Sequence, residues 1–133
     1  MSRSFVAQLA LPMALLLTAC AGAARSQSSA GPTTARTEQG LATYYADSLA
    51  GNKTASGERY DPQAMTAAHR TLPFGTIVDV ERPNGKKVRV RINDRGPFAS
   101  KKRIIDLSRR AAEELGMIRD GVVPITLRVV GKE

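Results

Sequence analysis

Aromatic residues, cysteine and histidine are scarce in this chain of 133 residues, which has no Trp, three Phe, three Tyr, one Cys and one His. One cysteine cannot form a disulfide framework, and one Cys with one His falls short of a closed zinc site. The sequence also contains no glycine-rich phosphate loop and no nucleophile elbow around a serine. It therefore implies neither a metal nor a cofactor.

The shortage of aromatic residues also limits the core, which must consist mainly of Val, Ile, Leu and Ala. This composition favours a β-rich fold over a helical one. The first forty residues differ in composition from the rest, so roughly 90 residues remain for one small domain.

The N-terminal segment is typical of a secretion signal. An apolar run from Phe5 to Leu17 follows Arg3 and is too short to span a bilayer. Leu17-Thr18-Ala19-Cys20 resembles the lipobox of bacterial lipoproteins, in which the signal is cut before a cysteine that is then diacylated. We expect residues 1–19 to be a lipoprotein signal peptide and Cys20 to carry the lipid, rather than to be a small residue beside a cleavage site.

The cellular location follows from the same segment. Ala21, and not Asp, follows the cysteine, which by resemblance favours the periplasmic face of the outer membrane over the inner membrane. Residues 21–39 are rich in Ala, Gly, Ser, Thr and Pro without a hydrophobic period, as in a flexible linker. We therefore expect a linker over residues 20–39 and a folded domain over residues 40–133.

Within the domain, short alternating strands dominate. Asn84-Gly85 between two alternating segments predicts a β-hairpin, Ser108 and Gly116 are suited to cap a short helix, and Asp61-Pro62 predicts a helical turn to Met65. Closure into a small barrel would remove exposed sheet edges. The expected elements are strands 41–45, 66–69, 76–82, 86–92, 104–107 and 123–129, with a helix over 108–115.

The stretch Arg91–Phe98, which reads Arg-Ile-Asn-Asp-Arg-Gly-Pro-Phe, ends one of these strands in a turn. Asp94 continues the apolar parity of Ile92, so strict alternation predicts that its side chain points to the buried side. The same alternation places Arg91 and Arg95 on the outer face. A buried acid is costly unless it is paired or used.

The net charge of +8 raises the question of nucleic acid binding. Eleven Lys or Arg residues lie between Arg82 and Arg110, against Asp94 and Asp106. No aromatic platform is interleaved with them, and an exported lipoprotein rarely meets nucleic acid. We expect no nucleic acid partner, and instead a solvated basic face or one attracted to an anionic wall polymer or membrane.

Four ordered motifs resemble the rare lipoprotein A (RlpA) family. They are Thr54–Glu58, Thr66–Thr76, Arg91–Phe98 and Arg103–Ser108. The resemblance implies a mainly β fold, a six-stranded double-psi β-barrel with one short helix, which also occurs in expansins and some endoglucanases. It implies lytic transglycosylase action on peptidoglycan, with a preference for glycan strands that lack stem peptides.

By position, the resemblance carries the family's implicated residues over to Glu58, His69 and Asp94. Asp94 is the expected acid that protonates the glycosidic oxygen. Glu58 would bind sugar or share a proton with Asp94, and His69 would hydrogen-bond either of these two carboxylates or the substrate. We expect Arg91, Arg95 and Tyr45 to bind substrate at the cleft.

Each of these residues also has a purely structural interpretation. A lone histidine is often a structural hydrogen-bonder, Glu58 follows a Ser-Gly turn, and Asp94 could cap its own turn. Asp106 is interpreted as structural, pairing an arginine. The alternative to an enzyme is a non-catalytic, expansin-like module that binds or loosens the wall. A third interpretation is a lipoprotein that recruits cell-division or wall-synthesis proteins.

Overall fold

The computed structural model describes residues 36–133, so the predicted signal peptide, Cys20 and most of the predicted linker lie outside the described part. No helix within residues 36–133 is long and apolar enough to cross a membrane. A short 3-10 helix, η1, spans Asp47–Leu49. The other elements are β1 (Thr37–Tyr44), β2 (Thr66–His69), β3 (Thr76–Glu81), β4 (Lys87–Asp94), β5 (Arg103–Leu107), α1 (Arg109–Leu115) and β6 (Val123–Lys132).

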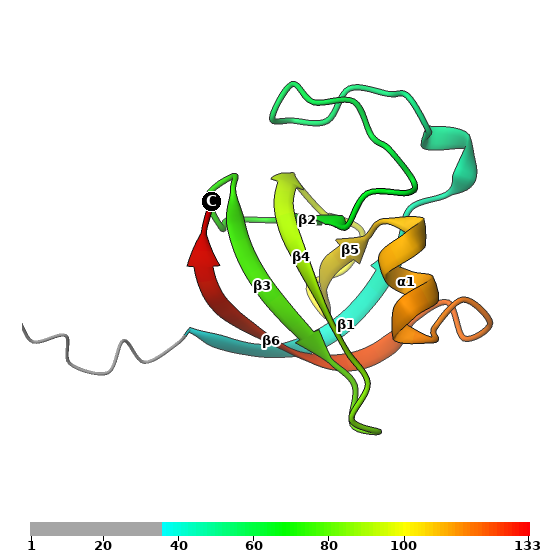
Figure 1. Cartoon of the computed structure of the whole chain (residues 1–133). Coiled ribbons are helices and arrows are strands. Elements are labelled where there is room, and N and C mark those ends of the chain that lie inside the picture. The colour runs from blue at the N-terminus through cyan, green and yellow to red at the C-terminus, as the bar shows by residue number, and fades with distance from the viewer. Residues whose placement is uncertain (1–35) are drawn as a thin grey trace, which may run out of the picture. The chain divides into compact units, whose positions relative to one another are not determined.

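The six strands close into one barrel in the order β1-β5-β2-β4-β3-β6 (Figure 1). The pairs β1–β5 and β2–β4 are parallel, and the other neighbours are antiparallel. This confirms the expected mainly β fold with six strands and one short helix. Each of these strands has two hydrogen-bonded neighbours, so closure removes the exposed edges of an open sheet.

The predicted hairpin is confirmed. The Arg82 amide donates to the Lys86 carbonyl at 2.8 Å, and the Asn84 side-chain oxygen accepts from the Lys86 amide at 2.9 Å. In β4 the valines are buried while Lys87 and Arg89 are exposed. One face of this ladder therefore faces the core and the other faces water, as the alternation predicts.

Helix α1 also begins and ends where predicted. The Ser108 hydroxyl accepts a hydrogen bond from the Ala111 amide, and Gly116 adopts the left-handed conformation (φ 72°) that ends the helix. Ala111, Ala112 and Leu115 form the inner face of the helix and are fully buried. A side chain at Gly116 would be strained by this φ value.

The helical turn predicted at Asp61–Met65 is wrong, because residues 62–64 form a turn only. The Asp61 carboxylate accepts from the Gln63 amide at 2.9 Å, and the Ala64 amide donates to the Asp61 carbonyl at 3.1 Å. Aspartate thus hydrogen-bonds the backbone two residues ahead. The chain then enters β2 at Thr66, which leaves no length for a helix.

The barrel interior is filled by aliphatic side chains, as the composition predicts. Buried valines, isoleucines and leucines of β3, β4, β5 and β6 form one cluster with alanines of β1 and β2 and one face of α1. Strand β1 begins at Thr37, inside the segment expected to be linker, and Thr37–Ala42 pair with Arg128–Val123 of β6. The connection from β1 to β2, residues 45–65, extends beyond the end of the barrel beside β2 (Figure 1).

Candidate active site

A bulge in β4 determines where Asp94 lies. Ala67 of β2 pairs with Ile92, but the next residue, Ala68, pairs with Asp94, so Asn93 is an extra residue on β4. Ile92 and Asn93 are both buried, and Asp94 is only half-buried. The prediction from strict alternation, that Asp94 points to the apolar side, is therefore wrong. The bulge resets the alternation and turns Asp94 to the outer face of the barrel wall.

Four residues on neighbouring strands, Asp94 among them, form one row across the barrel wall. Asp106 of β5 pairs directly with Thr43 of β1 and with Ala68 of β2, and Ala68 pairs with Asp94. Directly paired residues project their side chains to the same face of a sheet. The sequence neighbours Ala42, Ala67 and Ile105 belong to the core. These four residues, Thr43–Asp106–Ala68–Asp94, therefore lie on the outer face, and we call them the acid row. One carboxyl group lies on each side of Ala68.

Two tyrosines border the acid row. The rings of Tyr45 and Tyr60 stack with centroids 4.3 Å apart, and both pack with Ala68 in a separate small cluster. The Tyr45 hydroxyl donates a hydrogen bond to Oδ2 of Asp94. Burial and this bond to Asp94 raise the pKa of Tyr45 far above its ordinary value, so Tyr45 keeps its proton and acts as a donor. Tyr45 therefore lies beside Asp94, and its expected role in substrate binding stays a prediction.

The Asp94 carboxylate accepts hydrogen bonds from three donors. Besides Tyr45, the backbone amides of Ala55 and Arg95 each donate to Oδ1 at 2.8 Å. The Ala55 amide comes from the long connection between β1 and β2, so this loop is fastened directly to the acid. Asp94 is therefore the hydrogen-bond acceptor for all three of these groups.

Asp106 is the carboxyl group of the acid row that sequence reasoning missed. Its Oδ1 accepts a hydrogen bond from the Thr43 hydroxyl at 2.9 Å. No ion pair joins it to an arginine within residues 36–133, so the interpretation as an arginine partner is wrong. Burial raises the pKa of Asp106, and the charge of Asp94 raises it further. The sequence did contain a signal for this position. Asp106 lies between Ile105 and Leu107, whose side chains point into the core, so alternation places Asp106 on the outer face.

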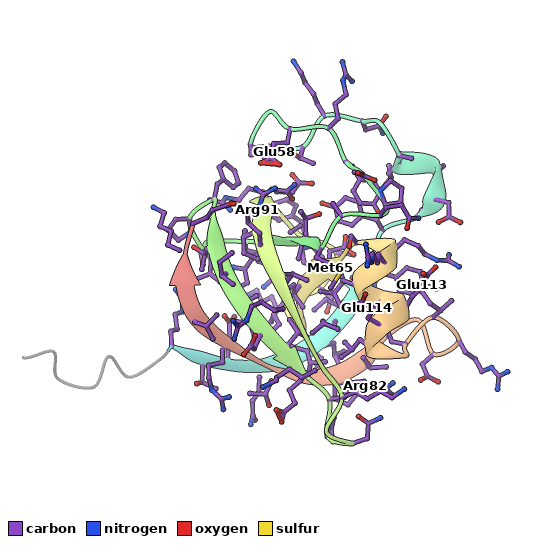
Figure 2. All side chains as sticks on the ribbon, viewed as in Figure 1. Glu58, Met65, Arg82, Arg91, Glu113 and Glu114 are labelled. Carbon is purple, nitrogen blue, oxygen red and sulfur yellow. The ribbon has the colours of Figure 1, made fainter. Side chains whose placement is uncertain are left out.

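Glu58 lies next to the acid row but contacts basic and amide groups. Its two carboxylate oxygens accept from the Arg91 guanidinium at 2.7 and 2.8 Å, as the labelled pair in Figure 2 shows. Asn93 Nδ2 lies 3.4 Å from Oε1. The hydrogen bond from Arg91 lowers the pKa of Glu58. Its partners are therefore Arg91 and Asn93, and not a proton shared with Asp94.

Arg91 connects three parts of the chain through its side chain. It is paired with Glu58 of the loop and, through Nε, with the Glu133 carboxylate at 3.1 Å. Its guanidinium was expected to bind substrate, but in this structure it is occupied by two carboxylates. Arg91 thus fixes the loop that carries Ala55 onto the barrel.

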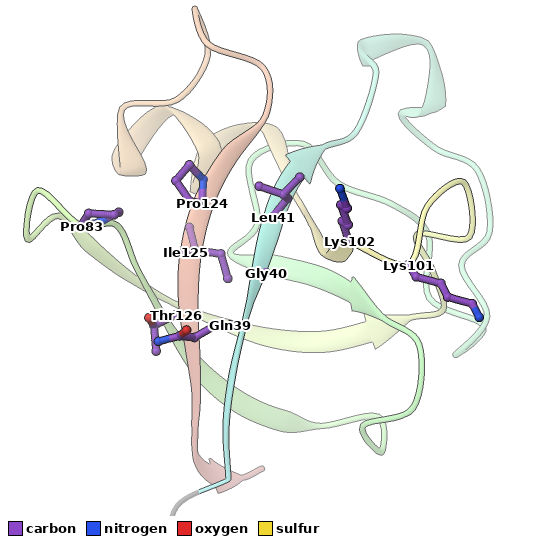
Figure 3. A pocket seen from close by; sticks show the side chains of 9 residues that line it. All are labelled: Gln39, Gly40, Leu41, Pro83, Lys101, Lys102, Pro124, Ile125 and Thr126. Carbon is purple, nitrogen blue, oxygen red and sulfur yellow. The ribbon is translucent and has the colours of Figure 1, made fainter.

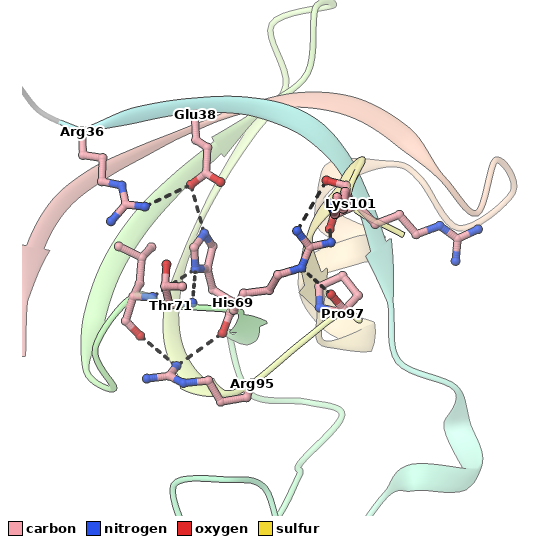
Figure 4. A network of polar contacts seen from close by, with 10 residues as sticks. Arg36, Glu38, His69, Thr71, Arg95, Pro97 and Lys101 are labelled. Carbon is pink, nitrogen blue, oxygen red and sulfur yellow. Dashed lines mark hydrogen bonds and ion pairs between the residues drawn. The ribbon is translucent and has the colours of Figure 1, made fainter. Parts of the chain in front are cut away.

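His69 is buried, and both ring nitrogens have partners (Figure 4). Nδ1 accepts from the amides of Thr71 and Leu72 at 3.1 Å, and Nε2 lies 3.0 Å from Oε2 of Glu38. Two backbone donors on Nδ1 leave the proton on Nε2. Burial lowers the pKa of His69. The carboxylate that His69 contacts therefore belongs to Glu38, a residue expected in the linker, and not to Glu58 or Asp94.

Arg95 does not extend outward as its parity predicted. Its Nη1 donates to the Leu72 carbonyl at 2.8 Å and to the His69 carbonyl at 3.3 Å, and the guanidinium lies 4.1 Å from the Phe74 ring centroid. Figure 4 shows the side chain folded against the loop after β2. The bulge at Asn93 explains the change, because it turns Arg95 as well as Asp94. Arg95 therefore holds the loop around His69.

A groove of about 700 Å³ lies elsewhere on the barrel, between β1, β6 and the tip of the β3–β4 hairpin (Figure 3). Its walls are largely apolar, and its charged side chains are Lys101 and Lys102. No carboxyl group lines it, so it offers no acid for glycoside chemistry. The acid row is the better candidate for a reactive centre. Within residues 36–133, no three His, Asp or Glu side chains are grouped to hold a metal ion.

Comparison with known proteins gives matches over the barrel. Residues 37–127 match the family described as lytic transglycolase. A protein of Nostoc sp., named probable endolytic peptidoglycan transglycosylase RlpA, is 57% identical over 97 residues, which are 71% of this chain and 26% of that protein. The endolytic peptidoglycan transglycosylase RlpA of Campylobacter jejuni is 48% identical over 96 residues, 71% of this chain and 34% of that protein. The chain spans about a quarter to a third of the length of these relatives.

Solved structures agree on the fold. The Streptomyces papain inhibitor superposes with a TM-score of 0.58 at 30% identity, covering 71% of this chain and 94% of the inhibitor. The apo expansin of Clavibacter michiganensis gives a TM-score of 0.57 at 29% identity, covering 71% of this chain and 50% of the expansin. Together with the family match, these similarities confirm the predicted double-psi β-barrel.

Proposed function

Since this chain belongs to the lytic transglycolase family over residues 37–127, we propose that it is an endolytic peptidoglycan lytic transglycosylase. Its substrate would be glycan strands that are poor in stem peptides, and it would cleave the glycosidic bond between N-acetylmuramic acid and N-acetylglucosamine. The product would be a 1,6-anhydro end. The names of the relatives from Nostoc and Campylobacter support the same activity.

The chemistry requires few groups. A carboxylic acid protonates the glycosidic oxygen while positive charge develops at the muramyl anomeric carbon. The C6 hydroxyl of the same sugar then attacks that carbon, so no carboxylate is needed to activate water. An intramolecular nucleophile is already held close to its target, which removes much of the entropic barrier.

The observation that carries this proposal is the acid row. Asp94 and Asp106 flank Ala68 on an outer face of the barrel wall, and both residues are half-buried. Two carboxyl groups are thereby held on the same face with one small residue between them. The tyrosine pair and the loop fastened by Ala55 border the same place.

The test is to incubate the purified full chain with peptide-free glycan strands and to identify the products by mass spectrometry. We expect anhydromuramyl ends with the wild type and a loss of at least about 100-fold with Asp94→Asn, as for removal of a group that acts in the transition state. Wild-type protein that is folded and yields no such ends would overturn the proposal.

A second candidate function is glycan binding without bond cleavage, and the similarity to the Clavibacter expansin favours it. A further solved structure in the same group is titled as a mutant of that expansin in complex with cellohexaose. Binding of glycan strands in a sedimentation assay without the appearance of new ends would support this function in place of the enzyme.

We also propose that residues 1–19 are a signal peptide and that Cys20 anchors the protein to the periplasmic face of the outer membrane. The lipobox-like Leu-Thr-Ala-Cys stretch supports this proposal. Peptidoglycan would then lie within reach of the linker, and cell-division or wall-synthesis proteins would be the natural partners. Membrane fractionation of Cys20→Ser tests the anchor, because the proposal requires this variant to leave the membrane fraction.

A further inference from the structure

Asp106 differs from Asp79, another carboxyl group held in the barrel wall, because within residues 36–133 no cation forms an ion pair with it. Asp79 is held by Arg89 at 2.8 Å and by Lys87 at 3.9 Å. Asp106 accepts one bond, from the Thr43 hydroxyl at 2.9 Å. Asp106 is half-buried, and a carboxyl group that is partly shielded from water without a cation is costly when ionised. The fold therefore holds a carboxyl group in a position that stability alone does not explain.

The position of Asp106 relative to Asp94 is set by backbone pairing. Both residues are paired with Ala68, one from β5 and one from β4, so their side chains rise from the same face with one strand between them. The two surroundings differ. Three donors point at the Asp94 carboxylate, whereas within residues 36–133 the Thr43 hydroxyl is the one donor to the Asp106 side chain. Two nearby carboxyl groups in unlike surroundings can take different roles, one as an acceptor and the other as a proton donor.

The charged and titratable groups around Asp106 act in opposite directions. Burial raises its pKa, and the negative charge of Asp94 raises it further, while the Thr43 hydroxyl and the positive charge of Arg103 lower it. Burial raises the pKa of Tyr45, and the negative charges of Asp94 and Asp106 raise it further, so Tyr45 keeps its proton and is neutral. The effects that raise the pKa of Asp106 outweigh those that lower it. This agrees with the absence of an ion-pair partner for Asp106 within residues 36–133.

We propose that Asp106 is the proton donor of the acid row and that Asp94, the acceptor of three hydrogen bonds, faces the positive charge that develops at the anomeric carbon. This inference rests on the proposed function and deepens it. It differs from the expectation that Asp94 is the acid, because the three donors on Asp94 suit an acceptor and the single donor on Asp106 leaves one oxygen free to carry a proton.

The reaction balances with Asp106 as the acid and then the base. The Asp106 proton passes to the glycosidic oxygen, the bond from that oxygen to the muramyl C1 breaks with its electron pair, and the oxygen leaves as a hydroxyl of N-acetylglucosamine. The muramyl O6 forms the new bond to C1 and gives its proton to the Asp106 carboxylate. Asp106 is thereby restored, and no water is consumed.

The first test reads protonation without activity. The full chain, labelled with ¹³C at the aspartate carboxyl carbons, is titrated by NMR in wild type, Asp94→Asn and Asp106→Asn, the last of which assigns the Asp106 signal. We expect the Asp106 carboxyl to titrate above the ordinary range of aspartate, and to titrate at lower pH in Asp94→Asn because a neighbouring negative charge is removed. Titration of Asp106 in or below the ordinary range would overturn the inference.

The second test reads catalysis on peptide-free glycan strands as a function of pH. We expect Asp106→Asn to lower turnover by about 100-fold or more, and the loss of activity at high pH to begin at lower pH in Asp94→Asn, as far as its residual activity can be followed. Asp79→Asn is the matched control, since it removes a buried carboxylate outside the acid row; we expect it to keep activity.

The outcomes separate the two proposals. An active wild type with an equally active, folded Asp106→Asn variant would overturn the role of Asp106 and leave the proposed function intact. A folded wild type without activity would overturn the proposed function, whatever the NMR titration shows.

Discussion

The Tyr45 hydroxyl donates a hydrogen bond to the Asp94 carboxylate, although the two residues are 49 positions apart in the sequence. Tyr45 lies directly after β1, and Asp94 is the last residue of β4. The contact joins the start of the long connection to the end of the hairpin strand. The Tyr60 ring stacks on the Tyr45 ring and so helps to hold the Tyr45 hydroxyl in place.

The variant Tyr45→Phe should keep the ring stack and lose only the donor. We expect a fall in the free energy of unfolding of about 1.5–3 kcal/mol, the usual contribution of a hydrogen bond to a charged group, and a fall in turnover of roughly tenfold. Urea unfolding and the glycan assay measure the two effects. Tyr60→Phe is the control, because the Tyr60 hydroxyl accepts from the Arg109 amide and does not touch Asp94. Unchanged turnover in Tyr45→Phe would contradict the role of the donor.

The pair Glu58–Arg91 should act on activity through the loop that carries Ala55. Glu58→Gln weakens the pair, so the Ala55 amide is held less firmly on Asp94, and we expect turnover to fall by about tenfold. The pair is partly exposed, so the free energy of unfolding should change by less than about 1 kcal/mol. The double exchange Glu58→Arg with Arg91→Glu restores opposite charges and should recover part of the turnover. Because Arg91 also pairs with Glu133, the exchange is made together with Glu133→Gln, and no recovery in that background would indicate that Glu58 acts directly on substrate.

The lowered pKa of Glu58 gives this pair a pH dependence with a defined sign. A carboxyl group whose pKa is lower in the folded state stabilises the fold above its unfolded pKa, and this contribution is lost as the pH falls through the folded pKa. We expect the difference in free energy of unfolding between wild type and Glu58→Gln to shrink below about pH 4.5. A difference that grows on acidification would contradict the assignment.

Protonation of His69 should destabilise the fold. Burial lowers its pKa, so between the unfolded pKa of about 6.5 and the lower folded value the unfolded chain binds more protons. The contribution of neutral His69 to the free energy of unfolding is therefore complete above about pH 6.5, and it is lost as the pH falls. A proton on Nδ1 would also face the Thr71 and Leu72 amides. Urea unfolding between about pH 5 and pH 7.5 should show a loss in the wild type that is smaller in His69→Asn, and equal losses would contradict this prediction.

Gly40 should not accept a side chain. A Cβ atom there would lie 2.7 Å from Cγ2 of Ile104 and 3.0 Å from the Lys102 carbonyl oxygen. We expect Gly40→Ala to lower the free energy of unfolding by about 1–3 kcal/mol through overpacking. Gly131 on β6 is the matched control, because a Cβ atom there meets nothing within 4 Å. A neutral Gly40→Ala variant would show that Ile104 can move aside.

Much of the fold could be predicted from local sequence. The Asn-Gly turn, the alternation of valine with basic residues and the Ser108 and Gly116 caps each depend on residues close together in the chain, and all are confirmed. The turn after Asp61 was predicted as helical because the same residue types begin helices and turns. Only the continuation of the chain into β2 distinguishes the two.

The candidate site was less predictable, because its residues meet through strand pairing. Glu38 was placed in a linker by its polar neighbours, yet pairing between β1 and β6 brings it to His69. The resemblance to RlpA proteins identified Glu58, His69 and Asp94 as important positions. It did not reveal that Glu58 contacts Arg91 or that His69 contacts Glu38.

The sequence by itself determined the strands, the hairpin, the capped helix and the presence of an acid at the mouth of β4. The tertiary structure decided which way that acid points and which carboxyl group accompanies it. The reason is physical: alternation is a local property of one strand, whereas the bulge at Asn93 and the row Thr43–Asp106–Ala68–Asp94 exist only when strands from distant parts of the chain pair in a particular register.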